Sequence, residues 1–112
     1  MSTLPPQHTL RAYGVALRLL RAVLAANIAD AEIRNQATRA AKRTALNCAE
    51  GAGRVSRADK ARVFAIARGE CVEACGAVEI ARDAGDTSAE AYAAVESIAC
   101  ELYAMLTKLV RH

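Results

Sequence analysis

The spacing of the apolar residues, which recur every three to four positions along almost the whole chain, most constrains the fold. Such spacing places side chains on one face of an α-helix, and no stretch shows the alternation of a half-buried strand. Short turn sequences divide the pattern into four segments. We therefore predict an all-α fold, an antiparallel up-down-up-down four-helix bundle in a single domain, with helices at about residues 10–27, 31–52, 57–84 and 88–111.

A chain of 112 residues fits one domain. Residues 1–9, which contain Pro5 and Pro6, are expected to form a flexible N-terminal arm, and residues 10–112 the bundle. Asp30 is a plausible N-cap for the second helix. Two capping boxes are predicted to open the third and fourth helices, Ser56 with Asp59 and Thr87 with Glu90.

Two glycines are expected to end the second helix. Gly51 and Gly53 follow its apolar pattern directly, and glycine is the residue that most readily takes the left-handed conformation found at helix ends. We therefore predict that both supply left-handed conformations and turn the chain into the third helix.

The first helix carries two apolar stripes on roughly opposite sides. One comprises Leu10, Tyr13, Leu17, Leu20 and Leu24; the other comprises Val15, Leu19, Ala22 and Ala26. Only one stripe can face the core of the monomer. We expect the other to meet a neighbouring subunit, which predicts a homo-oligomer.

The cysteines and histidines favour neither a cofactor nor catalysis. Cys48, Cys71, Cys75 and Cys100 form no C-x-x-C pair, and we interpret them as small buried apolar residues in a reducing cytoplasm. The two histidines, His8 and His112, lie near the termini, so neither a zinc site, a di-iron bundle nor a nucleophile–base pair is supported. Cys71 and Cys75 share a helix face at i, i+4 and could ligate a soft metal or form a redox pair, but we prefer buried packing. We expect no enzyme activity, cofactor, metal, signal peptide or membrane span.

Charge is unevenly divided along the chain. Residues 1–68 carry 12 Lys and Arg against 4 Asp and Glu, whereas residues 69–112 carry 3 against 8. The basic residues of the second helix and the start of the third predict a surface that binds RNA or DNA through phosphates. These residues are Arg34, Arg39, Lys42, Arg43, Arg54, Arg57, Lys60 and Arg62. The alternatives are a solvated face or neutralisation between the halves or between subunits.

A second group of polar residues is predicted to be structural. Asn47 and Glu50 lie near the end of the second helix, where they can hydrogen-bond to Arg54 or to open backbone amides. Glu70 and Glu73 complete the cluster. Such a group could instead mark a metal or acid–base site, but buried charges persist mainly when paired, so we prefer the structural interpretation.

Several of these segments resemble a known family. Gln36-Ala-Thr-Arg-Ala-Ala41, Asn47-Cys-Ala-Glu-Gly-Ala-Gly-Arg54, and Phe64 with Ile66-Ala-Arg-Gly-Glu70 and Glu73 are similar to the four-helix-bundle family first noticed as open reading frames in intervening sequences of bacterial 23S ribosomal RNA. The resemblance implies an antiparallel bundle that assembles into a ring, commonly a pentamer. Members include the accessory variability protein of diversity-generating retroelements, a basic ring that binds nucleic acid and a reverse transcriptase.

Two functions are therefore expected, from different classes. The first is a cytoplasmic, non-enzymatic homo-oligomer, commonly a pentamer in this family, that binds structured RNA or DNA and serves an RNA-processing or reverse-transcribing partner. The second is a structural scaffold whose charges contact neighbouring subunits or a protein partner without binding nucleic acid.

Overall fold

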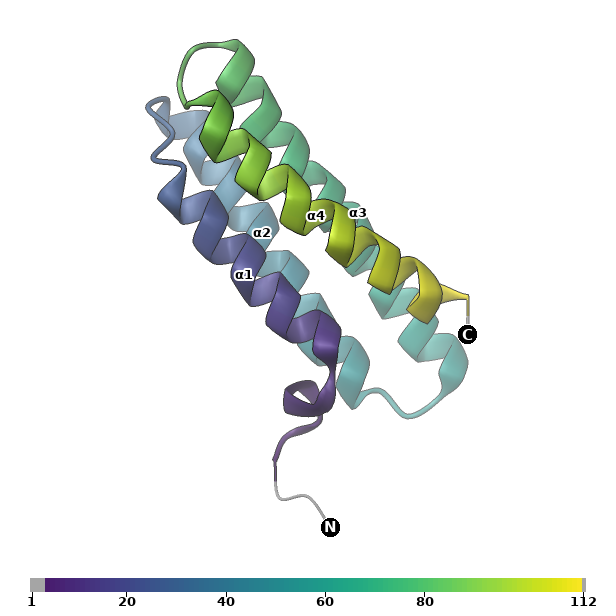
Figure 1. Ribbon diagram of the computed structural model, residues 1–112. Coiled ribbons are helices and arrows are strands. Elements are labelled where there is room, and N and C mark those ends of the chain that lie inside the picture. The colour runs from purple at the N-terminus through teal and green to yellow at the C-terminus, as the bar shows by residue number, and fades with distance from the viewer. Residues whose placement is uncertain (1–3, 112) are drawn as a thin grey trace.

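Four long helices carry the fold, as Figure 1 shows. The computed structural model describes residues 4–111, in which a short 3₁₀ helix η1 (Pro6–Thr9) precedes α1 (Arg11–Ala25), α2 (Ala31–Gly53), α3 (Arg57–Asp83) and α4 (Ala89–Val110). Successive helices run antiparallel, and the bundle measures 47 × 26 × 21 Å. No strand occurs among the described residues. The predicted all-α four-helix bundle is confirmed.

Hydroxyl and carboxylate side chains cap the N-termini of three of the helices. The side-chain oxygens of Asp30, Ser56 and Ser88 accept the backbone N–H three residues further on, at 2.9, 3.1 and 3.0 Å. Each bond pairs one amide that the first helical turn leaves open. The caps at Asp30 and Ser56 are as predicted.

The predicted cap at Thr87 is wrong, because Ser88 takes that position. The Thr87 hydroxyl instead donates to the carbonyl oxygen of Ala26 at 2.6 Å. This bond ties the α3–α4 turn to the end of α1, a contact across the bundle that local sequence does not reveal.

The prediction that Gly51 and Gly53 adopt left-handed conformations is also wrong. α2 continues through both, and the chain leaves the helix at Arg54, whose φ of −72° and ψ of 153° are extended. The left-handed positions within residues 4–111 are Asn27 (φ 46°) and Gly85 (φ 81°), in the α1–α2 and α3–α4 turns. Gly51 serves packing: a Cβ built there would lie 2.6 Å from Cε1 of Phe64.

The core is built largely from alanine. Ala37, Ala40 and Ala41 on α2 and Ala67 and Ala74 on α3 are fully buried, and α2 with α3 forms the most extensive helix pair. Small side chains let the two helix axes approach closely. This close pair positions the polar residues at the α2–α3 corner.

The two stripes of α1 differ in burial. Val15, Leu19 and Ala26 of one stripe are buried in the core and Ala22 is half-buried. The other stripe lies at the margin of the bundle: Tyr13 is half-buried, and Leu24 is 53% exposed. The structure thus assigns the core stripe, and the second stripe packs against the core only in part and keeps exposed apolar area.

The described residues begin before the bundle, with η1. Within the predicted N-terminal arm, residues 6–9 form η1, while residues 1–3 and 112 lie outside the described residues. None of the helices in the described part combines the length and apolar character needed to cross a membrane.

Candidate nucleic-acid interface

Three of the predicted phosphate-binding cations form a free patch on α2. Arg39, Lys42 and Arg43 are exposed and lie at i, i+3 and i+4, so they share one helix face. None of them makes an ion pair or side-chain hydrogen bond within residues 4–111. Arg39 and Lys42 also line a shallow hollow of about 230 Å³ with Asn35 and Thr38. We call Arg39, Lys42 and Arg43 the α2 basic face.

Four of the other predicted cations have partners within the fold. Arg34 donates to the carbonyl oxygens of Ile28 at 2.9 Å and Ala29 at 3.4 Å, in the α1–α2 turn. Arg54, Lys60 and Arg62 are held at the α2–α3 corner. Arg57, the remaining one, is exposed at the start of α3 and has no such partner in the described part of the chain. The eight cations therefore do not form one uniform surface.

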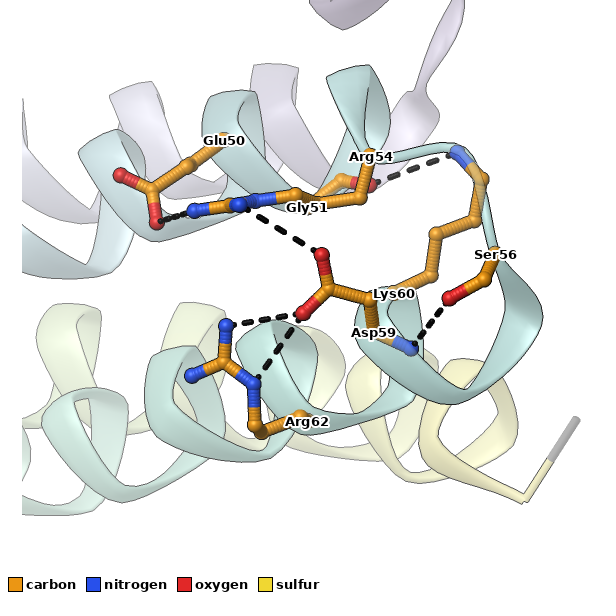
Figure 2. Close-up of polar contacts among 7 residues, drawn as sticks. All are labelled: Glu50, Gly51, Arg54, Ser56, Asp59, Lys60 and Arg62. Atoms are coloured by element: carbon orange, nitrogen blue, oxygen red, sulfur yellow. Dashed lines mark hydrogen bonds and ion pairs between the residues drawn. The ribbon is translucent and has the colours of Figure 1, made fainter.

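Charged side chains from both helices meet at the α2–α3 corner, which Figure 2 shows. Arg54 donates to Glu50 at 3.0 Å and lies 3.4 Å from Asp59. The other carboxylate oxygen of Asp59 accepts two bonds from Arg62, at 2.8 and 3.1 Å. The predicted contact between Glu50 and Arg54 is present. Its carboxylate and guanidinium are about half exposed, at 54% and 40%, so the pair contributes little net stability.

The pKa values at this corner follow from the pairing. The hydrogen bond to Glu50, and then the charge of Asp59, raise the pKa of Arg54 above its usual value. The hydrogen bonds from Arg62, with the charges of Arg54 and Arg62, hold the pKa of Asp59 below its usual value, against a smaller opposing effect of burial. At neutral pH both groups are therefore charged.

Lys60 closes the end of α2. Its ammonium donates to the carbonyl oxygens of Ala52 at 2.9 Å and Gly51 at 3.4 Å, as Figure 2 shows for Gly51. The last carbonyls of a helix lack intrahelical partners and carry partial negative charge, so a cation there is favourable. Lys60 has a structural partner and is less available for a phosphate.

The remaining members of the predicted polar cluster make no side-chain hydrogen bond or ion pair within the described residues. Phe64 packs on Gly51, and Glu70 lies six residues beyond Phe64 on α3, about 9 Å further along the helix. One carboxylate oxygen of Glu70 is buried and has no hydrogen-bond partner among the described residues. Asn47 is half-buried and Glu73 is exposed. The structure joins Glu50 to Arg54, and it shows no hydrogen bond or ion pair among the other three within residues 4–111.

Two features of this region were missed from the sequence. Asp59 links Arg54 to Arg62, and its spacing of three from Arg62 was the available signal. Leu46, 68% exposed, lies on α2 at i+3 from Arg43, so an apolar side chain adjoins the α2 basic face. The apolar periodicity of the helices indicated neither the bridging position of Asp59 nor the exposure of Leu46.

The thiols are placed for packing more than for chemistry. Burial raises the pKa of both Cys48 and Cys71 to about 12, so these thiols stay neutral. Cys75 is half-buried, but Cys100 is exposed, which corrects the prediction that all four are buried. Residues 4–111 contain no group of three His, Cys, Asp or Glu side chains that could hold a metal ion.

Comparison with known proteins assigns the family. The model of the 23S rRNA-intervening sequence protein family matches residues 9–108, which includes the first helix as well as the segments quoted above. The comparison with curated proteins gives no match for this chain. Because the match spans nearly the entire bundle, the chain belongs to the 23S rRNA-intervening sequence protein family.

Proposed function

We propose that the protein is a non-enzymatic, self-associating helical bundle that binds structured RNA or DNA through the α2 basic face. The observation that carries the proposal is the set of three adjacent cations, Arg39, Lys42 and Arg43, which are exposed and have no partner in the described chain. Cations that stabilise a fold are usually paired, as Arg54 and Arg62 are here. Unpaired cations on one face are available for phosphates.

The chemistry of α2 favours the sugar-phosphate backbone over the bases. Stacking on single-stranded bases requires exposed aromatic rings, and α2 has no aromatic residue. Arg and Lys at helical spacing provide charge without sequence recognition. We therefore propose binding that is independent of sequence and steeply dependent on salt.

Self-association is supported by the second stripe of α1 and by the family resemblance. Leu10, Tyr13, Leu17 and Leu20 are only half-buried and Leu24 is exposed, so the stripe has apolar area left to cover. Members of the family are commonly pentameric. In a ring, one α2 basic face from each protomer would act together on a single nucleic acid, and a reverse-transcribing or RNA-processing protein is the partner we propose.

The test reverses the three charges. We expect Arg39→Glu, Lys42→Glu and Arg43→Glu in one chain to lower affinity for structured RNA and duplex DNA by more than tenfold. For duplex DNA, the negative slope of log affinity against log salt concentration should become shallower by about 3 per bound protomer, because each phosphate contact contributes about one unit to it. A matched control reverses Arg11, Lys108 and Arg111, which are also exposed and unpaired in residues 4–111. Equal binding by the α2 variant and the parent would refute the proposal.

A scaffold function is the second candidate, and Leu46 favours it. An exposed leucine beside Arg43 suits a protein contact better than a phosphate. If this function is correct, the assembly will dissociate at high salt, Leu46→Ser will weaken it, and neither RNA nor DNA will be retained.

A further inference from the structure

A groove between α3 and α4 is separate from the α2 basic face. Figure 1 shows these two helices side by side, and the groove between them encloses about 330 Å³. α3 contributes Val72, Cys75 and Gly76 to its walls, and α4 contributes Cys100 and Tyr103. The functions proposed above make no use of this surface.

The groove is apolar and open to solvent. Val72 is 55% exposed and Tyr103 is 44% exposed. Burial raises the pKa of the Cys75 thiol, so it is a neutral side chain at physiological pH. Exposed apolar area at a concave site is typical of an interaction surface.

Gly76 has no explanation within the fold of one chain. It lies inside α3, where glycine is about 1 kcal/mol less favourable than alanine. A Cβ built at this position would meet no atom within 4 Å. The missing side chain keeps the groove open, and another backbone could approach closely there.

Carboxylates flank one end of the groove. Glu79 of α3 lines it, and Glu96 of α4 lies one helical turn from Cys100, toward the same end. Tyr92 connects them: its hydroxyl donates to Glu96, and its ring centroid lies 4.4 Å from the guanidinium carbon of Arg82, which pairs with Glu79. Arg82 lies 3.7 Å from Glu79, and Glu96 accepts a bond from Tyr92 at 2.8 Å, so both carboxylates keep free lone pairs.

We propose that this groove binds an amphipathic helix of a partner protein, with small apolar side chains on the buried face and a Lys or Arg beside Glu79 and Glu96. The walls are α-helices, whose own backbone groups are already paired, so they cannot pair the backbone of an extended peptide. A helix satisfies its backbone internally and fits between two parallel ridges. The carboxylates repel nucleic acid and select a basic helix.

The probe is a synthetic amphipathic peptide of about five helical turns with lysines flanking an alanine–leucine stripe. Its matched control has the same apolar stripe and glutamates in place of the lysines. The readout is the rate at which iodoacetamide alkylates Cys100, the exposed thiol of the groove, followed on the full-length protein by peptide mass spectrometry. At a free peptide concentration of about ten times Kd, about nine in ten grooves are occupied, so alkylation of Cys100 should slow about tenfold. The glutamate peptide should give no protection.

Substitutions at two residues of the groove test whether the peptide binds there. Gly76→Leu should fill part of the groove and abolish protection, while Gly69→Leu, in the same helix with equally open space, should leave protection unchanged. Glu79→Lys should weaken protection by the lysine peptide and allow protection by the glutamate peptide. Circular dichroism confirms that each variant is folded.

Three results would overturn the proposal. One is equal protection by both peptides. Another is protection that survives Gly76→Leu. The third is slower alkylation of Cys100 as the protein alone is concentrated, which would assign the groove to a second copy of this chain.

Discussion

Gly51 provides a quantitative test of how α2 and α3 pack. A Cβ at this position would lie 2.6 Å from Cε1 and 2.8 Å from Cδ1 of Phe64, about 1 Å closer than carbon atoms normally approach. Phe64 is only 4% exposed, so its packed ring has to shift to admit the methyl group. Overpacking of this kind costs about 1–3 kcal/mol.

Replacing Gly51 by alanine also has a favourable effect. Alanine is about 1 kcal/mol better than glycine inside a helix. We therefore expect Gly51→Ala to lower the free energy of unfolding by about 1 kcal/mol, the overpacking cost less the helix-propensity gain. For a domain of this size that corresponds to a fall in Tm of about 4 °C.

Gly69 is the matched control. It lies in the interior of α3, is exposed, and has no atom within 4 Å of a Cβ. Gly69→Ala should therefore raise stability by up to about 1 kcal/mol, so the two variants should differ by about 2 kcal/mol. Urea and thermal denaturation, followed by far-UV circular dichroism at one fixed protein concentration, measure both.

A double-mutant cycle identifies the cause. In a Phe64→Leu background, the ring that opposes the new methyl is removed, and Gly51→Ala should become neutral or stabilising. If Gly51→Ala is as stable as Gly69→Ala in the parent background, the close contact between α2 and α3 at Phe64 is not as described.

Three further predictions concern the turns and the corner. Lys60→Met should lower the free energy of unfolding by about 1 kcal/mol, because two carbonyls at the end of α2 lose their donor; an unchanged urea midpoint would contradict this role. Thr87→Val should also cost about 1 kcal/mol, since the bond to Ala26 is lost, with far-UV circular dichroism of the native state unchanged. Asp59 has a lowered pKa in the folded state, so its contribution is complete above the unfolded pKa of about 4 and is lost as pH falls through the folded value. Asp59→Asn should therefore flatten the acid limb of the stability–pH curve, and an unaltered limb would rule this contribution out.

The periodicity of the sequence predicted the helices well because helix packing depends on local spacing. The buried faces of α2, α3 and α4 consist of residues three to four positions apart, among them Thr44, Phe64 and Leu102. The caps at Asp30 and Ser56 were also predicted, since the capping bond joins residues three apart.

The errors arose where contacts cross the bundle. Glycine at the end of an apolar pattern predicts the end of a helix. At Gly51, however, glycine is required because the ring of Phe64, thirteen residues away on another helix, occupies the space of a side chain. Thr87 and Ser88 are both capable of capping, and only the position of Ala26 separates them. Local patterns carry no information on such distant partners.

The basic surface was predicted as a set, and the structure divides it by partner. Sequence identified all eight cations but not which ones the fold uses. Lys60 binds helix carbonyls and Arg62 pairs with Asp59, whereas Arg39, Lys42 and Arg43 remain unpaired within residues 4–111. This division depends on the geometry of the α2–α3 corner.

Fluorescence anisotropy tests the central claim most directly. Labelled structured RNA and duplex DNA are titrated with the parent protein and with the Arg39→Glu, Lys42→Glu, Arg43→Glu variant, each at two salt concentrations. Binding by the parent that weakens steeply with salt, and that is lost in the variant, is the predicted result. No binding by the parent at low salt, or equal binding by both proteins, would contradict the assignment of the α2 basic face to phosphates.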